Sequence, residues 1–140
     1  MILLRKSLVD TIKRHEGLRL KPYLCTAGRL TIGYGRNLET NGISGDEAEY
    51  LLKNDIERAT WACYERIPFF SDAPLQVQDV LVNMCFQLGI NGLLAFKKTL
   101  KLLEEKKYSE ASKEMLNSNW AKQTPNRAKE LYEIIRNVKP

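Results

Sequence analysis

Hydrophobic residues repeat at helical spacing near the start of the chain. Leu4, Leu8 and Ile12 recur every four residues, and charged residues occupy much of the rest of each turn. This spacing predicts an amphipathic helix over residues 1–15. Gly17 follows it, and a glycine just past the last turn commonly ends a helix.

The pattern changes over residues 18–37, where apolar residues alternate with polar residues or glycines. A period of two predicts short β-strands, and Ala27-Gly28 marks a turn between them. We therefore expect a small antiparallel β-hairpin lobe over about residues 17–40. No other segment shows a comparable strand pattern.

From Ser44 the pattern is helical nearly to the end of the chain. Ser44 and Glu47 have the spacing of a capping box, which predicts a helix start. An apolar stripe over residues 77–88 predicts the central buried helix. Gly89 is expected to end this helix, and residues Leu93 to Leu103 predict a further helix. Ser109 is expected to cap the start of the next helix, and Thr124 with Pro125 marks the start of the last one.

These elements predict an α+β fold with an N-terminal helix, a small β lobe and a larger, mainly helical C-terminal lobe. We expect residues 1–140 to form a single domain, in which the helical lobe takes residues 44–140 together with the first helix. The length of 140 residues, with 44% hydrophobic and 28% charged residues, is typical of one globular domain.

Apolar runs along the chain are short. None approaches the roughly 20 residues that a membrane-spanning helix needs. At the N-terminus the apolar residues precede the charged ones, which is the reverse of a signal peptide. We therefore expect no signal peptide, no stable membrane association, and a monomer kept in the cytoplasm unless another factor exports or releases it.

The net charge of +5 predicts attraction to polyanions, and both nucleic acid and the anionic bacterial wall qualify. The three cysteines, Cys25, Cys63 and Cys85, form no CxxC pair, and His15 is the single histidine. This composition argues against a zinc site, and we expect neither a metal nor a cofactor. Cys63 and Cys85 fall in apolar helical patterns and are expected in the core.

Glu16 stands out among the acidic residues by its position. It ends the predicted first helix, directly before Gly17, at the border between helix and hairpin. A carboxylate there is expected to face the groove between two lobes. Most other acidic residues fall on helix faces among lysines and arginines, where a solvated charge is the ordinary interpretation.

The stretch from His15 to Gly35 resembles the signature of the phage lysozyme (endolysin) family of T4 type. In that family a Glu, an Asp or Cys nine positions later and a Thr six positions further on make the active site. Glu16, Cys25 and Thr31 have this spacing, in its Cys-containing form. Two later blocks, at residues 83–89 and 120–128, also match in the same order.

The resemblance implies a role for each of the three residues. Glu16 would donate a proton to the glycosidic oxygen between N-acetylmuramic acid and N-acetylglucosamine. Thr31 would bind the attacking water, although a β-branched residue is also ordinary in a strand. Cys25 would be activated by a neighbouring charge, hold water weakly or act as nucleophile. The alternative for Cys25 is a small apolar residue in a hairpin.

The resemblance also implies residues that contact or support the substrate. Phe86, Gln87 and Thr99 match positions that line the sugar cleft, although Phe86 fits a core position equally well. Arg127 is expected to approach Glu16 from the last helix, with a plain surface charge as its alternative. Arg36 stands where the family usually has His, and we expect it to pair with a carboxylate.

The implied function is a peptidoglycan hydrolase that cleaves the β-1,4 bond between N-acetylmuramic acid and N-acetylglucosamine, with inversion, and lyses bacteria for a phage or prophage. A lytic transglycosylase that uses Glu16 alone is one alternative, and a non-catalytic wall-binding protein is another. A nucleic-acid-binding module is disfavoured, because the chain has no aromatic-basic stripe and no helix-turn-helix pattern.

Overall fold

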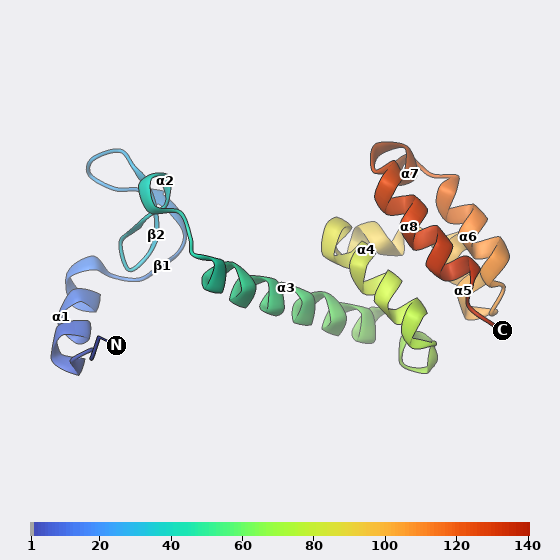
Figure 1. Ribbon diagram of the computed structural model, residues 1–140, viewed down its shortest axis with the longest axis horizontal. Helices are drawn as coiled ribbons and strands as arrows, with labels where there is room; N and C mark the ends of the chain where they lie inside the picture. Colours follow the sequence, from blue (N-terminus) through green and yellow to red (C-terminus); the bar gives the residue numbers. More distant parts are fainter. Residues whose placement is uncertain (1) are drawn as a thin grey trace. The chain divides into compact units, whose positions relative to one another are not determined.

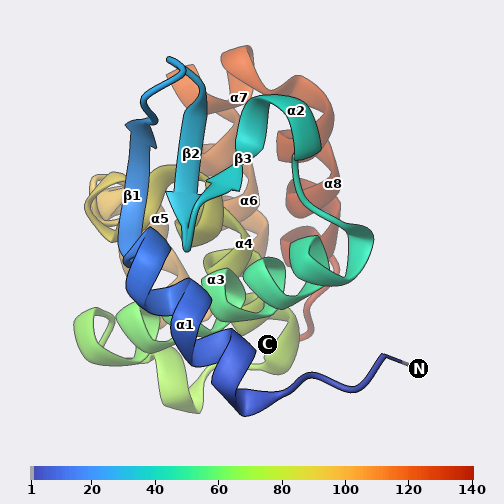
Figure 2. The same cartoon turned by 90° about the vertical axis from the view of Figure 1, so that its left-hand side faces the viewer.

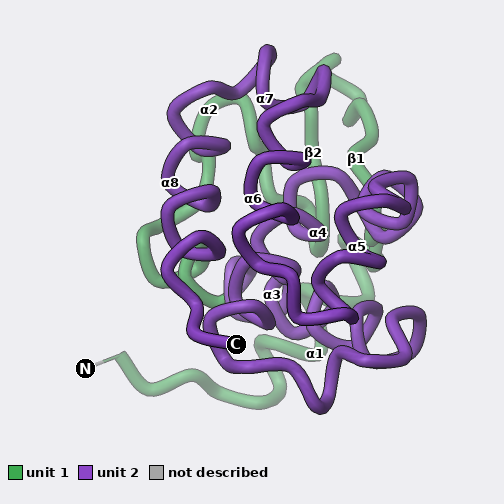
Figure 3. The backbone as a smooth tube through the Cα atoms, turned by 90° about the vertical axis from the view of Figure 1, so that its right-hand side faces the viewer, with its two compact units in different colours: residues 1–50 green, residues 51–140 purple. Residues whose placement is uncertain are grey.

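The computed structural model describes residues 2–140, which fall into two compact units divided between Tyr50 and Leu51 (Figure 3). Over these residues the chain contains eight α-helices and a three-stranded antiparallel sheet (Figure 1). The expected α+β class is confirmed.

The first unit begins with helix α1, Lys6–Glu16. The helix ends as predicted at Gly17, whose N–H donates to the carbonyl of Lys13 at 2.9 Å. The predicted start was wrong, because Arg5 has an extended backbone and Leu4 lies before the helix. No side chain accepts a hydrogen bond from the free amides at the start of α1, so the helix has no capping interaction at this end.

The sheet of the first unit has the order β1-β2-β3, and Figure 2 shows the three strands side by side. Strands β1, Arg19–Leu24, and β2, Leu30–Gly33, form the expected hairpin around a turn at residues 25–29. The short strand β3, Arg36–Asn37, pairs with β2 and was not predicted, because two residues carry no periodic pattern. Helix α2, Leu38–Asn41, follows it.

Helix α3, Gly45–Arg66, begins in the first unit and continues into the second. Its start confirms the predicted capping box. The amide of Glu47 donates to Ser44 Oγ at 3.1 Å, and the Ser44 amide donates to Glu47 Oε1 at 2.8 Å. Both groups would otherwise be unpaired at the helix start.

The second unit packs helices around one apolar core. After α3 come a short 3-10 turn, Phe70–Asp72, and helices α4, Leu75–Leu94, α5, Lys97–Glu104, α6, Tyr108–Leu116, α7, Asn119–Gln123, and α8, Pro125–Arg136. Large side chains that are almost fully buried include Phe70, Leu81, Met84, Leu93, Met115 and Ile135. Cys63 and Cys85 lie in this core, as expected.

Two of the helix boundaries in the second unit correct the predictions. Ser109 does not cap α6, because that helix already begins at Tyr108 after Lys107. The helix expected from Leu93 begins only at Lys97, since the chain bends between α4 and α5. Gly89 interrupts α4 with a φ of +74°, which confirms the predicted stop.

Among the described residues no single helix is long and apolar enough to cross a membrane. Helices α4 and α5 meet at an angle of 102°, and only when they are taken together do they have the length and apolar composition of a membrane span. The apolar side chains of α4 supply much of the second unit's core.

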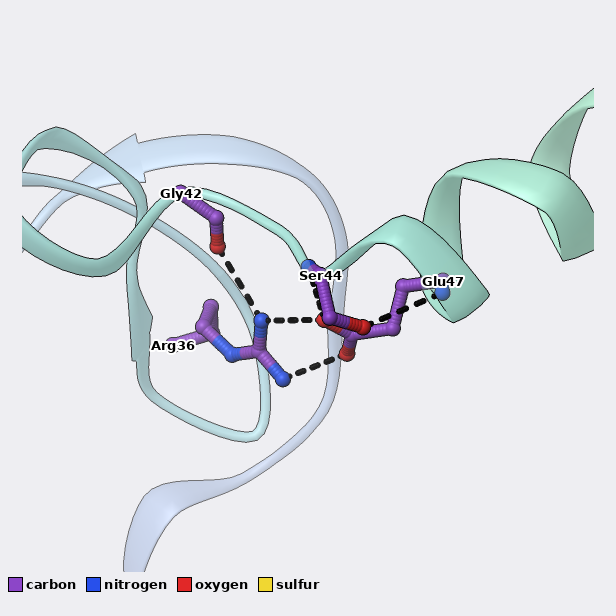
Figure 4. A network of polar contacts seen from close by, with 4 residues as sticks. All are labelled: Arg36, Gly42, Ser44 and Glu47. Atoms are coloured by element: carbon purple, nitrogen blue, oxygen red, sulfur yellow. Dashed lines mark hydrogen bonds and ion pairs between the residues drawn. The ribbon is translucent and has the colours of Figure 1, made fainter.

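A network of polar contacts ties β3 to the start of α3 within the first unit (Figure 4). Both guanidinium Nη groups of Arg36 donate to the carboxylate of Glu47, and Nη1 also donates to the Gly42 carbonyl at 3.0 Å. Arg36 thus has the carboxylate partner that we expected. The hydrogen bond from Arg36, followed by that from the Ser44 amide, lowers the pKa of Glu47 to about 2.

This network predicts an acid-dependent contribution to stability. The pKa of Glu47 falls from its ordinary 4.5 to about 2 on folding. The contribution of Glu47 to the free energy of unfolding is therefore complete above pH 4.5 and is lost as the pH falls towards 2. Urea unfolding of Glu47→Gln should show a lower midpoint than the parent at pH 7, and the difference should vanish near pH 2. Glu49→Gln, exposed on the same helix, is the matched control; an equal loss there would contradict the assignment.

Candidate active site

Glu16 is the last residue of α1, and its exposed side chain lies against Gly35 in the connection between β2 and β3. A Cβ atom at position 35 would lie 2.6 Å from Glu16 Oε2 and 2.9 Å from its Cδ. Gly35 also has a φ of +76°, which side chains other than glycine rarely adopt. Because glycine has no side chain, position 35 leaves room for the carboxyl group of Glu16.

Cys25 follows β1 directly and opens the turn into β2. Two backbone hydrogen bonds close this turn, from the Cys25 amide to the Arg29 carbonyl at 3.0 Å and from the Gly28 amide to the Cys25 carbonyl at 2.8 Å. Hydrogen bonds from the backbone of Arg29 and then Ala27 lower the pKa of the Cys25 thiol below its ordinary value. The turn therefore makes the Cys25 thiol more acidic than an ordinary cysteine.

Thr31 lies in β2 with only 3% of its surface exposed. Its hydroxyl is a further cause of the lowered pKa of Cys25. The same hydroxyl donates to the carbonyl of Arg29 at 2.8 Å. Because a hydroxyl has one proton, Thr31 can give it either to that carbonyl or to a thiolate or water beside it.

The first unit thus contains all three predicted catalytic residues, with Cys25 and Thr31 near each other at the turn of the hairpin. Within residues 2–140 no hydrogen bond or ion pair joins Glu16 to either of them. Their roles remain predictions. The same described range holds no group of three or more His, Cys, Asp or Glu side chains arranged for a metal ion.

In the second unit Phe86 and Arg127 line one pocket of about 440 Å³. Phe86 is 44% exposed on α4, so it is not a core residue in this structure. Arg127 donates through Nε to Asn83 Oδ1 at 2.8 Å and through Nη2 to the Asn83 carbonyl at 3.3 Å. The guanidinium group is therefore held in place from α4, and its approach to Glu16 stays a prediction.

Gln87 and Thr99 belong to the same unit and are held differently. The side-chain oxygen of Gln87 accepts a hydrogen bond from Trp120 Nε1 at 2.8 Å. This bond leaves the amide N–H₂ of Gln87 as its donor end. Thr99 is buried, and it lines a pocket of about 400 Å³ with Trp120 and Glu114.

Sequence reasoning missed two supporting residues of these pockets. Asn83 orients Arg127, and Lys98 forms an ion pair with Glu114 at 3.6 Å in the Thr99 pocket. Neither pairing has a local signature, because the partners lie 44 and 16 positions apart in the chain.

Comparison with known proteins identifies clear relatives. A family model described as phage lysozyme matches residues 13–136. Probable T4-type lysozyme 1 of Dictyostelium discoideum is 35% identical, over 92% of this chain and 93% of that protein. An endolysin of Acyrthosiphon pisum secondary endosymbiont phage 1 is 36% identical, over 79% of this chain and 75% of its own length. The pre-baseplate central spike protein Gp5 of Enterobacteria phage T4 is 28% identical, over 92% of this chain but 27% of its own length.

The contrasting surroundings of the three thiols predict selective chemistry at Cys25. Burial, followed by the nearby Cys85, raises the pKa of Cys63 to about 12, and burial also raises the pKa of Cys85. Iodoacetamide should therefore label Cys25 first in the folded protein at pH 7.5, as peptide mass spectrometry would show. The pH midpoint of this reaction should lie below that of a free cysteine peptide.

Thr31→Val tests whether the hydroxyl contributes to that midpoint. Because the variant loses a donor to the thiolate, its midpoint should move to higher pH. Thr40→Val, in the same unit, is the control. Faster labelling of Cys63 than of Cys25 would contradict the described surroundings of these thiols.

Proposed function

This chain belongs to the phage lysozyme family and is a peptidoglycan hydrolase, and we propose that it cleaves the β-1,4 bond between N-acetylmuramic acid and N-acetylglucosamine. The observation that carries the proposed bond and mechanism is the carboxyl group of Glu16, exposed at the end of α1 in the space left by Gly35. The proposal treats residues 1–140 as one lysozyme-like domain, because the family match extends across both units.

Glu16 is the proposed general acid. Breaking a glycosidic bond requires a proton on the leaving oxygen, and the transition state resembles an oxocarbenium ion. Among the described residues no ion pair engages this carboxyl group, so it is free to approach a substrate oxygen. Gly35 is the proposed reason that this carboxyl group keeps a defined position beside the sheet.

Cys25 and Thr31 together are the proposed water-binding pair. The thiolate favoured by the turn amides would accept a proton from water, and the Thr31 hydroxyl would orient that water. A negative sulfur there would also face the positive charge that develops on the sugar ring. Attack by water in place of an enzyme nucleophile gives inversion at the anomeric carbon.

Residues of the second unit are the proposed sugar contacts. Phe86 offers an exposed aromatic face, Gln87 offers amide donors, and Thr99 lines a polar pocket. A glycan needs such apolar surfaces with a few placed polar groups. Arg127, fixed by Asn83, is the proposed supporting cation for Glu16.

The remaining parts of the proposal concern partners and biological role. The reaction uses water alone, without metal or cofactor, and the protein acts as a monomer. It binds glycan strands, not nucleic acid or membrane. The name of the endolysin relative supports a role in bacterial lysis, with the protein held in the cytoplasm until it reaches the wall.

Three substitutions test the catalytic assignment. Glu16→Gln should abolish clearing of a purified peptidoglycan suspension, because the amide cannot donate the acid proton. Cys25→Ser should lower the rate by roughly 10²-fold, within the range of acid–base contributions, while Cys25→Asp should retain activity. Asp10→Asn, on the exposed face of α1, is the matched control. Full activity of Cys25→Ser would remove the thiol from the mechanism.

The products of the same digests distinguish hydrolysis from transglycosylation. Mass spectrometry of the released muropeptides should show reducing muramic acid ends, because water is the proposed attacking group. Anhydro-muramic acid ends would identify a lytic transglycosylase and overturn the proposed step.

Gly35→Ala tests the space beside Glu16. The added Cβ would displace the carboxyl group, so kcat should fall by roughly tenfold or more, since small misplacements of a catalytic group are costly. Gly42→Ala is the matched control, because Gly42 also has a positive φ but nothing lies within 4 Å of its Cβ position. Equal losses in the two variants would show that backbone strain alone explains the effect.

A further inference from the structure

The turn that carries Cys25 depends on one peptide group, the one that joins Arg29 to Leu30. Its carbonyl oxygen accepts two hydrogen bonds, from the Cys25 amide at 3.0 Å and from the Thr31 hydroxyl at 2.8 Å. The two residues of the proposed water-binding pair therefore share one acceptor. Because a peptide group is planar, the direction of this oxygen is fixed once the N–H on the other side of the group is held.

The N–H of this peptide group belongs to Leu30, and strand β3 does not reach it. In the sheet Thr31 pairs with Asn37, which is the last residue of β3. The next position along the chain already belongs to helix α2. The Leu30 amide donates instead to a side chain of that helix, Glu39, whose Oε1 lies 2.8 Å away. A hydrogen bond to an ionised carboxylate is stronger than one between neutral groups.

Glu39 is held in turn by the short helix that carries it. The Thr40 amide donates to Asn37 Oδ1 at 3.0 Å, which caps the start of α2. Just past the end of α2, the Gly42 carbonyl accepts a hydrogen bond from Arg36 at 3.0 Å. Figure 2 shows α2 directly after β3, and the helix contacts β2. The carboxylate therefore reaches the Leu30 amide from an element that is fixed at both ends.

A second contact of Glu39 is weaker. Its Oε2 lies 3.7 Å from Nη1 of Arg29, and both side chains are exposed. Exposed ion pairs contribute little, because water screens the charges and both side chains lose freedom. The hydrogen bond to the Leu30 amide is therefore the contact that can orient the peptide group. An uncharged oxygen at the same place could also accept it.

We propose that Glu39 is a positioning residue for Cys25 and Thr31. It holds the peptide group whose carbonyl oxygen accepts a hydrogen bond from each of them. This inference rests on the proposed function, in which the two residues bind the attacking water. Glu39 touches neither the water nor the sugar in this role, and it acts through the direction of one carbonyl oxygen.

Charge and position predict opposite effects of Glu39 on the Cys25 thiol. A carboxylate near a thiol disfavours the thiolate, so removal of its charge alone should lower the pKa of Cys25. Backbone hydrogen bonds, at Arg29 first and then at Ala27, are the largest causes that lower this pKa. A loosened turn should weaken these bonds and raise the pKa. The direction of the change therefore separates the two effects.

The pH midpoint of iodoacetamide labelling at Cys25 tests the proposal, with peptide mass spectrometry as the readout. Glu39→Ala should raise this midpoint by roughly 0.5 pH units, a part of what hydrogen bonds to an ionised group can contribute. Glu39→Gln keeps an oxygen acceptor without the charge, so its midpoint should lie at or below that of the parent. Thr40→Ala, on the same helix, is the matched control and should leave the midpoint unchanged.

Kinetics give a second measurement on the same variants. Glu39→Ala should lower kcat on purified peptidoglycan roughly threefold or more and leave KM unchanged, because small misplacements of reacting groups are costly. Glu39→Gln should restore kcat. Glu39→Asp keeps the charge but shortens the side chain by one methylene group, so it should behave as Glu39→Ala and serves in its place if the alanine variant unfolds. Circular dichroism checks the folding of each variant.

Three results would overturn the proposal. The first is an unchanged or lower midpoint in Glu39→Ala, because the turn would then keep its geometry without the carboxylate. The second is an equal rise in Glu39→Gln or Thr40→Ala, which would remove the Leu30 amide from the explanation. The third is a raised midpoint with unchanged kcat, which would separate the turn from the reaction.

Failure of the proposed function would appear elsewhere. Labelling of the thiol needs no catalysis, so the midpoints can be measured whether or not a variant is active. Clearing of peptidoglycan by Glu16→Gln protein would overturn the proposed acid, and full activity of Cys25→Ser would overturn the role of the thiol. Neither result changes the labelling midpoint of the Glu39 variants.

Discussion

The fit between Glu16 and Gly35 is the constraint on which the first unit's chemistry depends. A carboxyl group at the end of a helix has many ways to turn, and here it lies in space that any side chain at position 35 would fill. Gly17 ends the helix directly after Glu16, and its positive φ redirects the chain into β1. Two glycines therefore determine where the chain places its candidate acid.

The hairpin turn also bears on the proposal that the Cys25 thiol acts in place of a carboxylate. An aspartate is charged at neutral pH without help, whereas an ordinary cysteine is mostly protonated. The tight turn after β1 reduces this difference, because backbone hydrogen bonds at Arg29 and Ala27, and then the Thr31 hydroxyl, lower the pKa of the Cys25 thiol. Cys63 and Cys85 are buried in the core, and because burial raises the pKa of both thiols, these thiols stay neutral.

Local signals were enough to predict much of this fold. The capping box of Ser44 and Glu47 and the stop at Gly17 depend on residues a few positions apart, and both were predicted correctly. Ser109 shows the limit of such signals, because several polar residues near a helix start can satisfy the same rule. Strand β3 was missed, since its pairing with β2 determines it more than its two residues do.

The candidate site likewise combines features that local sequence predicts with contacts between residues far apart in the chain. The spacing of Glu16, Cys25 and Thr31 identified the candidate residues, but only the folded hairpin shows that Thr31 helps to lower the pKa of the Cys25 thiol. The partners that hold Gln87 and Arg127 come from positions 33 and 44 residues away, and no periodicity links them. Residue identity can therefore suggest a reaction, whereas the groups that orient the reacting atoms depend on packing between distant segments.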